Sequence, residues 1–266
     1  MKHYTSLWLL LLTAFVIFAV SSAFEMPYWG ERQLKSSGIA DVLLAEAEDD
    51  SDSEAPTVTG VPDTIAEQLD DAFPMPTDTA SQTILFIGDS MLEGLGPRLA
   101  AYAEHNGHQL YTVIWYSSTS EIWAKSDRLK SYISRIKPTY IFVSIGGNEL
   151  FVRDIAAKRR KYVEKIIAEI GDIPFVWIGP PNWREDTGIN ELIARSAPRG
   201  TFFLSNGMSF ERGADGAHPT RQSAALWLDS VMRWMPQNAL HPIRMERPAN
   251  DSGRANRVFM HKPDDR

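Results

Sequence analysis

Short runs of apolar residues alternate along the chain with segments in which apolar residues recur at helical spacing. The runs are apolar throughout, as is typical of strands buried on both faces, and they cover residues 83–87, 110–115, 140–145, 174–178 and 201–204. Between them, Leu129, Tyr132, Ile133 and Ile136 lie at positions i, i+3, i+4 and i+7, which is one face of a helix. This alternation predicts an α/β fold with a mainly parallel, five-stranded sheet and helices on both faces.

The N-terminal segment has a different pattern, because residues 7–20 (LWLLLLTAFVIFAV) carry no charge and show no polar face. Lys2 precedes this run and the small residues Ser21, Ser22 and Ala23 follow it, which is the arrangement of a cleaved secretory signal in residues 1–24. The alternative is an uncleaved anchor, since residues 7–24 are just long enough to span a bilayer. Either interpretation predicts export to the periplasm or cell surface of a bacterium, and an uncleaved segment would anchor the protein in the inner membrane.

Two polar segments flank the α/β pattern. Residues 45–55 (AEAEDDSDSEA) are acidic and almost without large apolar groups, so residues 25–80 are interpreted as a flexible acidic tether. Residues 241–266 are predicted to be a disordered polar tail for the same reason. The catalytic or binding domain is therefore expected in residues 81–240.

Composition limits the partners and the types of site that the chain can have. The net charge of −7 disfavours nucleic acid as a partner, because a polyanion would be repelled. The chain has no cysteine, which excludes disulfides and thiolate zinc sites. Nothing in the sequence indicates an oligomeric state.

The first polar loop, Gly88-Asp89-Ser90, follows the first strand directly and precedes a helical pattern. Ser90 or Asp89 could simply cap that helix, since both side chains accept hydrogen bonds from free N–H groups. A nucleophile at the same place gains from the helix dipole and from backbone N–H groups that stabilise an oxyanion. In parallel sheets ligands bind at the carboxyl ends of the strands, where this loop lies.

The other two polar loops offer complementary groups. Gly147 and Asn148 follow the third strand, where they form either a glycine-rich turn or a site in which the Asn148 amide donates to an oxyanion. Asp215 and His218, in ADGAHPT, lie before the last helix. Their spacing suits a carboxylate that orients an imidazole, although metal ligation or a plain turn before a proline-started helix also fits.

Together, ILFIGDSM, YIFVSIGGNEL and DGAHPT resemble the motifs of the SGNH (GDSL-type) hydrolases, over about residues 82–236. The resemblance implies a flavodoxin-like three-layer α/β/α sandwich and a serine esterase without metal or organic cofactor. It makes Ser90 the nucleophile, His218 the general base and Asp215 the residue that orients His218. It also makes Asn148 and the backbone N–H of Ser90 oxyanion donors.

The sequence departs from the family pattern after the second strand. Where the family usually has a glycine whose N–H is a further oxyanion donor, the loop reads YSSTSEIW, and alignment places Ser120 at that position. Ser120 keeps the N–H, but a positive φ would strain it. Glu149 likewise stands where an aspartate is commoner.

Four further residues are expected to contact the substrate. Asp89 and Gly147 adjoin the candidate nucleophile and oxyanion donor. Asn182 and Trp183 follow the fourth strand at the same edge of the sheet. For the latter pair, a rigid turn that covers the core is an equal alternative.

The sequence therefore favours an exported serine esterase. Its substrate would be a short-chain, acetyl ester on a carbohydrate such as peptidoglycan or a surface polysaccharide. Two alternatives remain: an O-acyltransferase that passes the same acyl-enzyme to a sugar hydroxyl, and a non-catalytic glycan-binding protein.

Overall fold

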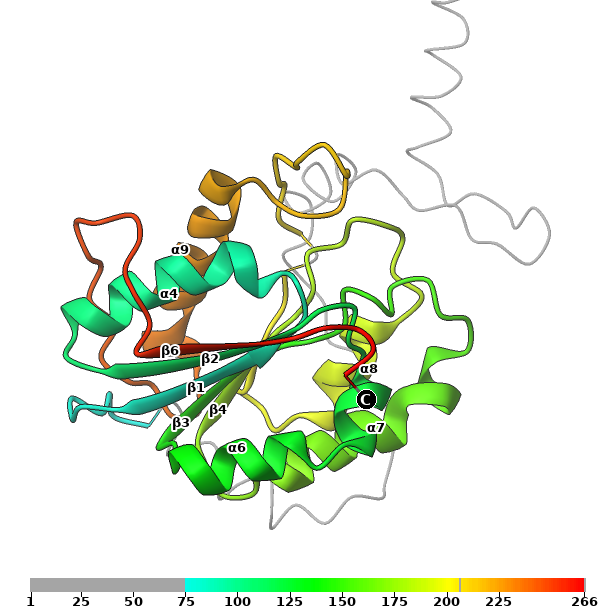
Figure 1. The fold of residues 1–266 in the computed structure, drawn as a ribbon, viewed down its shortest axis with the longest axis horizontal. Helices are drawn as coiled ribbons and strands as arrows, with labels where there is room; N and C mark the ends of the chain where they lie inside the picture. The colour runs from blue at the N-terminus through cyan, green and yellow to red at the C-terminus, as the bar shows by residue number, and fades with distance from the viewer. Residues whose placement is uncertain (1–74, 206, 266) are drawn as a thin grey trace, which may run out of the picture. The chain divides into compact units, whose positions relative to one another are not determined.

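The computed structural model describes residues 75–205 and 207–265, which form layers around one parallel sheet (Figure 1). The predicted signal or anchor, and nearly all of the predicted tether, fall outside these residues. No helix in the described part of the chain is long and apolar enough to cross a membrane.

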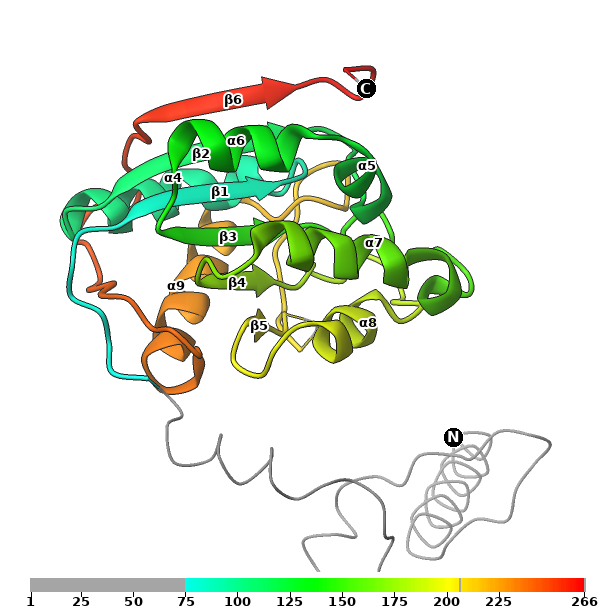
Figure 2. The same ribbon diagram turned by 90° about the horizontal axis from the view of Figure 1, so that it is seen from below.

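The sheet has six strands in the order β5-β4-β3-β1-β2-β6, and every neighbouring pair is parallel (Figure 2). The strands are β1 (Thr83–Gly88), β2 (Gln109–Trp115), β3 (Tyr140–Ser144), β4 (Phe175–Ile178), β5 (Phe202–Phe203) and β6 (Arg257–His261). β1 lies between β2 and β3, so the chain steps to one side of β1 and then to the other. In open α/β sheets, ligands bind in the crevice that forms where the strand order reverses in this way.

Helices cover both faces of the sheet, as the sequence predicts. They are α4 (Leu92–His105), α5 (Ser120–Lys125), α6 (Arg128–Ile136), α7 (Ile155–Ile170), α8 (Ile189–Ser196) and α9 (Arg221–Asn238). Helices α4 and α9 pack on one face, and α5 to α8 pack on the other (Figures 1 and 2). The three-layer α/β/α architecture is confirmed.

Alternate residues of β1 explain why the strand is apolar throughout. Ile84 and Phe86 face the core formed with α4 and α9, while Leu85 and Ile87 face the core formed with α5 to α8. All four side chains are fully buried. A strand that contributes to two cores has no face left for polar residues.

The sheet has one strand more than the predicted five, because β6 lies within the predicted disordered tail and pairs with β2 along its length. β6 is an edge strand, and Val258 and Met260 are 50% and 59% exposed. It therefore lacks the continuous apolar run by which a buried strand is recognised. The ordered unit also exceeds residues 81–240, since Asp78 N donates to Pro242 O at 2.8 Å and Asp78 forms a bridge with Ile243.

A buried ion pair joins the two helices on the α4 face. Nε of Arg98 lies 2.7 Å from Oδ1 of Asp229, and the two side chains are 2% and 3% exposed. Tyr102 donates its hydroxyl to the same oxygen at 2.9 Å. Removing one member of a buried pair costs more than the pair contributes, because the other charge stays buried without compensation.

We expect Asp229→Ala to lower the free energy of unfolding by about 3–5 kcal/mol, measured by urea denaturation. Glu164→Ala is the matched control, since Glu164 makes an exposed ion pair with Arg160 at 3.9 Å. That change should cost no more than about 1 kcal/mol. Equal losses in the two variants would show that the buried pair does not stabilise the helix packing.

Candidate active site

The loops after β1, β2 and β3 meet at one edge of the sheet because these strands are neighbours. They carry Ser90, residues 116–119 and Asn148, respectively. Asn148 Nδ2 donates to the carbonyl of Ser118 at 2.9 Å and lies 3.4 Å from Oδ2 of Asp89, so one side chain connects all three loops.

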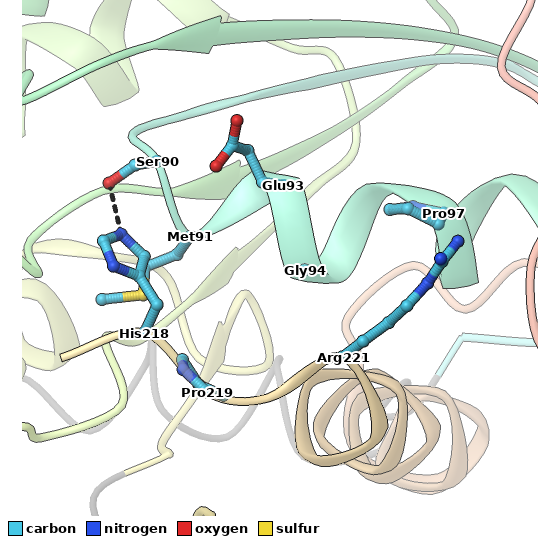
Figure 3. A pocket seen from close by; sticks show the side chains of 8 residues that line it. All are labelled: Ser90, Met91, Glu93, Gly94, Pro97, His218, Pro219 and Arg221. Atoms are coloured by element: carbon cyan, nitrogen blue, oxygen red, sulfur yellow. Dashed lines mark hydrogen bonds between the residues drawn. The ribbon is translucent and has the colours of Figure 1, made fainter. Parts of the chain in front are cut away.

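Ser90, His218 and Asp215 form a continuous hydrogen-bonded row. His218 Nε2 lies 2.8 Å from Ser90 Oγ (Figure 3), and Nδ1 lies 2.6 Å from Asp215 Oδ2. With the proton on Nδ1, Nε2 is free to accept the serine proton, which is the arrangement a hydroxyl nucleophile requires. The structure thus brings together the three residues that the sequence proposes as a triad.

Asp215 also holds its own loop. Its Oδ1 accepts from the backbone N–H groups of Ala217 at 2.9 Å and His218 at 3.0 Å. Gly216, between them, has φ +67, which a glycine adopts without strain. The hydrogen bond from His218, followed by those two N–H groups, lowers the pKa of Asp215 to about 2, so this carboxylate stays charged and keeps the imidazole oriented.

Two backbone N–H groups at the edge are free to receive an oxyanion. Within the described chain, neither Ser90 N–H nor Ser117 N–H enters a hydrogen bond. Asn148 Nδ2 can add a third donor by exchanging its long hydrogen bond to Asp89, at 3.4 Å, for one to the oxyanion. The Ser90 N–H adjoins the nucleophile, and an unpaired donor of this kind can stabilise the oxyanion of a tetrahedral intermediate.

The assignment of Ser120 as an oxyanion donor is wrong. Ser120 is 1% exposed, its N–H donates to Glu149 Oε2 at 2.8 Å, and its hydroxyl donates to Oε1 at 2.8 Å. Ser117 is instead the residue of this loop with positive φ, at 55°. The positive φ of this loop therefore occurs three residues before Ser120, and the N–H there is unpaired.

Glu149 holds the segment after β2 in place through hydrogen bonds with Ser120. It is fully buried, and besides Ser120 it receives Nε of Arg159 at 2.7 Å. Arg159 continues to Glu121 of α5, with Nη1 2.9 Å from Oε2. Burial raises the pKa of Glu149, although the bonds from Ser120 and Arg159 oppose that effect. This network joins the loop after β2 to the Asn148 loop and to α7.

Asp89 is buried at 2% exposure, with Oδ1 accepting from Met91 N at 3.0 Å. Loss of hydration raises its pKa to about 7 despite hydrogen bonds from the backbone. Gly147 is buried as well, and its carbonyl accepts from Trp183 Nε1 at 2.9 Å. Asp89 and Gly147 therefore support the loops, and the expectation that they contact substrate is corrected.

A cavity of about 420 Å³ opens beside the Ser90–His218 pair (Figure 3). Its walls include Glu93 and Pro97 of α4 and Arg221 of α9. Asn182 and Trp183 are not among its lining residues. Asn182 Oδ1 instead accepts from Asn190 Nδ2 at 3.0 Å, which fits the rigid-turn alternative.

Sequence reasoning missed Ser117, Arg159, Glu93 and Arg221. The last two had a usable signal, since Glu93 follows Ser90 by three residues on a predicted helix and Arg221 follows His218 by three. No such signal marks Ser117 or Arg159, because their roles depend on contacts with other loops.

The metal alternative for Asp215 and His218 finds no support in the geometry, since both nitrogens of His218 already face protein groups. In the described residues, no group of three or more histidine, aspartate or glutamate side chains could hold a metal ion.

Comparison with known proteins finds similarity among solved structures alone. No protein-family model and no curated protein matches this chain. Among solved structures, it is similar to the psychrotrophic esterase EstA from Pseudoalteromonas sp. inhibited by monoethylphosphonate, with TM-score 0.43, 16% identity and coverage of 57% of this chain and 97% of that one. TesA gives TM-score 0.43 and 21% identity over 57% of this chain and 97% of its own. A serine-to-alanine mutant of the esterase AlinE4 gives TM-score 0.38 and 20% identity over 58% of this chain and 94% of its own. With likenesses this low, function is inferred from the geometry of the site.

We expect Asp89→Asn to change how stability depends on pH. A carboxyl whose pKa rises from 3.8 to about 7 on folding contributes stability below pH 3.8 that is lost as the pH rises to about 7. The free energy of unfolding of the wild type, relative to the variant, should therefore fall by on the order of 4 kcal/mol across that range and then level off.

Urea denaturation of both proteins at intervals from about pH 4 to pH 8 measures this difference, and groups common to both cancel. A difference that stays constant with pH would show that Asp89 ionises normally and is not desolvated.

Proposed function

We propose that this protein is an exported serine esterase of the SGNH type that removes short acyl groups, above all acetyl, from a carbohydrate. The observation that supports this most directly is the hydrogen-bonded triad. His218 Nε2 lies 2.8 Å from Ser90 Oγ, His218 Nδ1 lies 2.6 Å from Asp215 Oδ2, and the N–H of Ser90 is unpaired. The family assignment is supported by the motif residues that suggested it, because four of them (Ser90, Asn148, Asp215 and His218) converge on one site. Export is supported by the apolar run of residues 7–20 alone.

The mechanism follows from the hydrogen bonds that join Ser90, His218 and Asp215. Ser90 Oγ attacks the ester carbonyl carbon while His218 Nε2 takes the serine proton. The carbonyl oxygen becomes an oxyanion that receives hydrogen bonds from Ser90 N–H, Ser117 N–H and Asn148 Nδ2. His218 then gives its proton to the alcohol oxygen, the ester C–O bond breaks, and an acyl-enzyme remains on Ser90.

Water completes the cycle. His218 takes a proton from the water that attacks the acyl carbon, and Ser90 leaves with that proton while the carboxylic acid departs. The side chains of His218 and Asp215 are 40% and 53% exposed, so solvent has access to this step.

An O-acyltransferase is the second candidate function, and the cavity on the His218 side supports it. A space that receives the departing alcohol can equally hold an alcohol that attacks the acyl-enzyme. Incubation with an acetylated glycan, with and without an unacetylated acceptor, separates the two. Free acetate indicates a hydrolase and acetylated acceptor indicates a transferase.

Ser90→Ala should abolish hydrolysis of 4-nitrophenyl acetate, with a loss on the order of 10⁶ in rate, because the oxyanion donors and binding effects alone remain. The far-ultraviolet circular dichroism spectrum should be unchanged, since the side chain is removed at a loop. Turnover within tenfold of the wild type would exclude Ser90 as the nucleophile.

The oxyanion donors can be tested by contrast. Asn148→Ala should lower kcat by roughly 10²–10³ with little change in KM, because its amide acts mainly in the transition state. Ser117→Gly keeps the N–H and relieves the positive φ, so kcat should stay within a few-fold while the melting temperature rises.

Ser120→Ala serves as the comparison for both variants, since its N–H already donates to Glu149. It should alter kcat less than Asn148→Ala does. If Ser120→Ala and Asn148→Ala were equally damaging, the oxyanion site as assigned here would be wrong.

A further inference from the structure

Arg221 is a charged residue in the catalytic cavity that the mechanism above does not use. It lines the same cavity as Ser90 and His218, is exposed, and its side chain makes no hydrogen bond or ion pair with any residue that the structure describes. Figure 3 shows its side chain rising from the start of α9 to Pro97, at the end of the cavity away from the Ser90–His218 pair. A guanidinium is always charged and matches a carboxylate with two parallel hydrogen bonds.

The position of the cavity decides which part of an ester reaches Arg221. The oxyanion donors Ser117 and Asn148 lie on the loops after β2 and β3, whereas the cavity is walled by α4, His218 and the start of α9. His218 must protonate the departing alcohol oxygen, so the alcohol half of the ester lies on the His218 side. The group that Arg221 meets is therefore carried by the alcohol, and not by the acyl group.

The same cavity offers acceptors for hydroxyl groups. The Glu93 carboxylate lines it and is held by the hydroxyl of Tyr116, 2.5 Å away. Pro97 has no N–H, so the Glu93 carbonyl lacks the donor that an uninterrupted helix would supply four residues later. An alcohol with several hydroxyl groups can donate to these oxygens.

The charges of Glu93 and Arg221 determine how an alcohol is oriented in the cavity. The net charge of −7 provides no long-range attraction for an anion, so selection depends on local contacts. An anionic group is repelled where Glu93 lies, near the start of α4, and attracted at Arg221 (Figure 3). An alcohol with hydroxyls toward Glu93 and an anion toward Arg221 satisfies both ends.

We propose that the alcohol half of the substrate is an acidic sugar whose carboxylate binds Arg221 while its hydroxyl groups donate to Glu93. This inference rests on the proposed esterase function and names its substrate class. It makes Arg221 a residue that determines specificity, and it predicts that acetylated polyuronates are hydrolysed in preference to their uncharged counterparts.

The test uses the full-length protein with O-acetylated oligogalacturonide and the same oligomer with its carboxylates methyl-esterified. Acetate release gives kcat/KM for each, and their ratio is the measured quantity. The wild type should prefer the acid form, and Arg221→Gln should lower the ratio about tenfold, mainly through KM. Arg221→Lys keeps the charge and should retain part of the preference.

Arg233→Gln is the matched control, because Arg233 is an arginine of the same helix that contacts Ser230 at 2.8 Å and does not line the cavity. It should preserve the ratio. A wild-type ratio near one, or the same ratio in wild type and Arg221→Gln, would overturn the acidic-sugar assignment even though 4-nitrophenyl acetate is hydrolysed through Ser90.

Failure of the proposed esterase function gives a different result, because no ester is then hydrolysed in a Ser90-dependent way. Calorimetric binding of the two oligomers to Ser90→Ala then decides the anion site without turnover. Tighter binding of the acid form that is lost in Ser90→Ala/Arg221→Gln supports the site, and equal binding of both oligomers overturns it.

Discussion

A β-carbon at Gly88 would lie 2.2 Å from the carbonyl oxygen of Ser144, far inside any permitted contact. Glycine at the end of β1 therefore allows the backbones of β1 and β3 to approach, and Asp89 N donates to that same oxygen at 3.2 Å. This approach brings the loop of Ser90 beside the loop of Asn148. The nucleophile and the amide donor thus depend on one missing side chain at the centre of the sheet.

The surrounding loops are held by buried charge as well as by apolar packing. Glu149 receives Ser120 and Arg159, and Arg159 reaches Glu121, so a single carboxylate connects two loops and two helices. Burying a carboxylate is costly unless its oxygens are hydrogen-bonded, and both oxygens of Glu149 are. The cost makes the arrangement specific, since a shifted loop would leave that charge unpaired.

The sequence predicted the parts of the fold that depend on burial on two faces. Strands β1 to β4 were visible because strands between two helical layers are continuously apolar, and the helices were visible by their spacing. β6 was not, since Arg257 and Met260 are exposed at an edge and the strand is recognised only by its pairing with β2. The triad was predictable because its residues belong to motifs. The positive φ of the loop after β2 falls at Ser117, three residues before the position that alignment chose, because four consecutive polar residues give no sign of which one adopts it.

Two aspartates near Ser90 show how environment separates like groups. Asp215 is solvated and bonded to His218, which keeps its pKa at about 2, whereas burial raises that of Asp89 to about 7. Asp89 lies 3.4 Å from Asn148 Nδ2, so a negative charge on it would oppose the negative charge that develops on the substrate oxygen bound there. A proton on Asp89 removes that opposition, while the charge of Asp215 stabilises the imidazolium of His218. Burial thus disfavours a negative charge on Asp89 beside Asn148, while Asp215 stays charged next to His218, and both effects favour the charges that develop in acyl transfer at a serine.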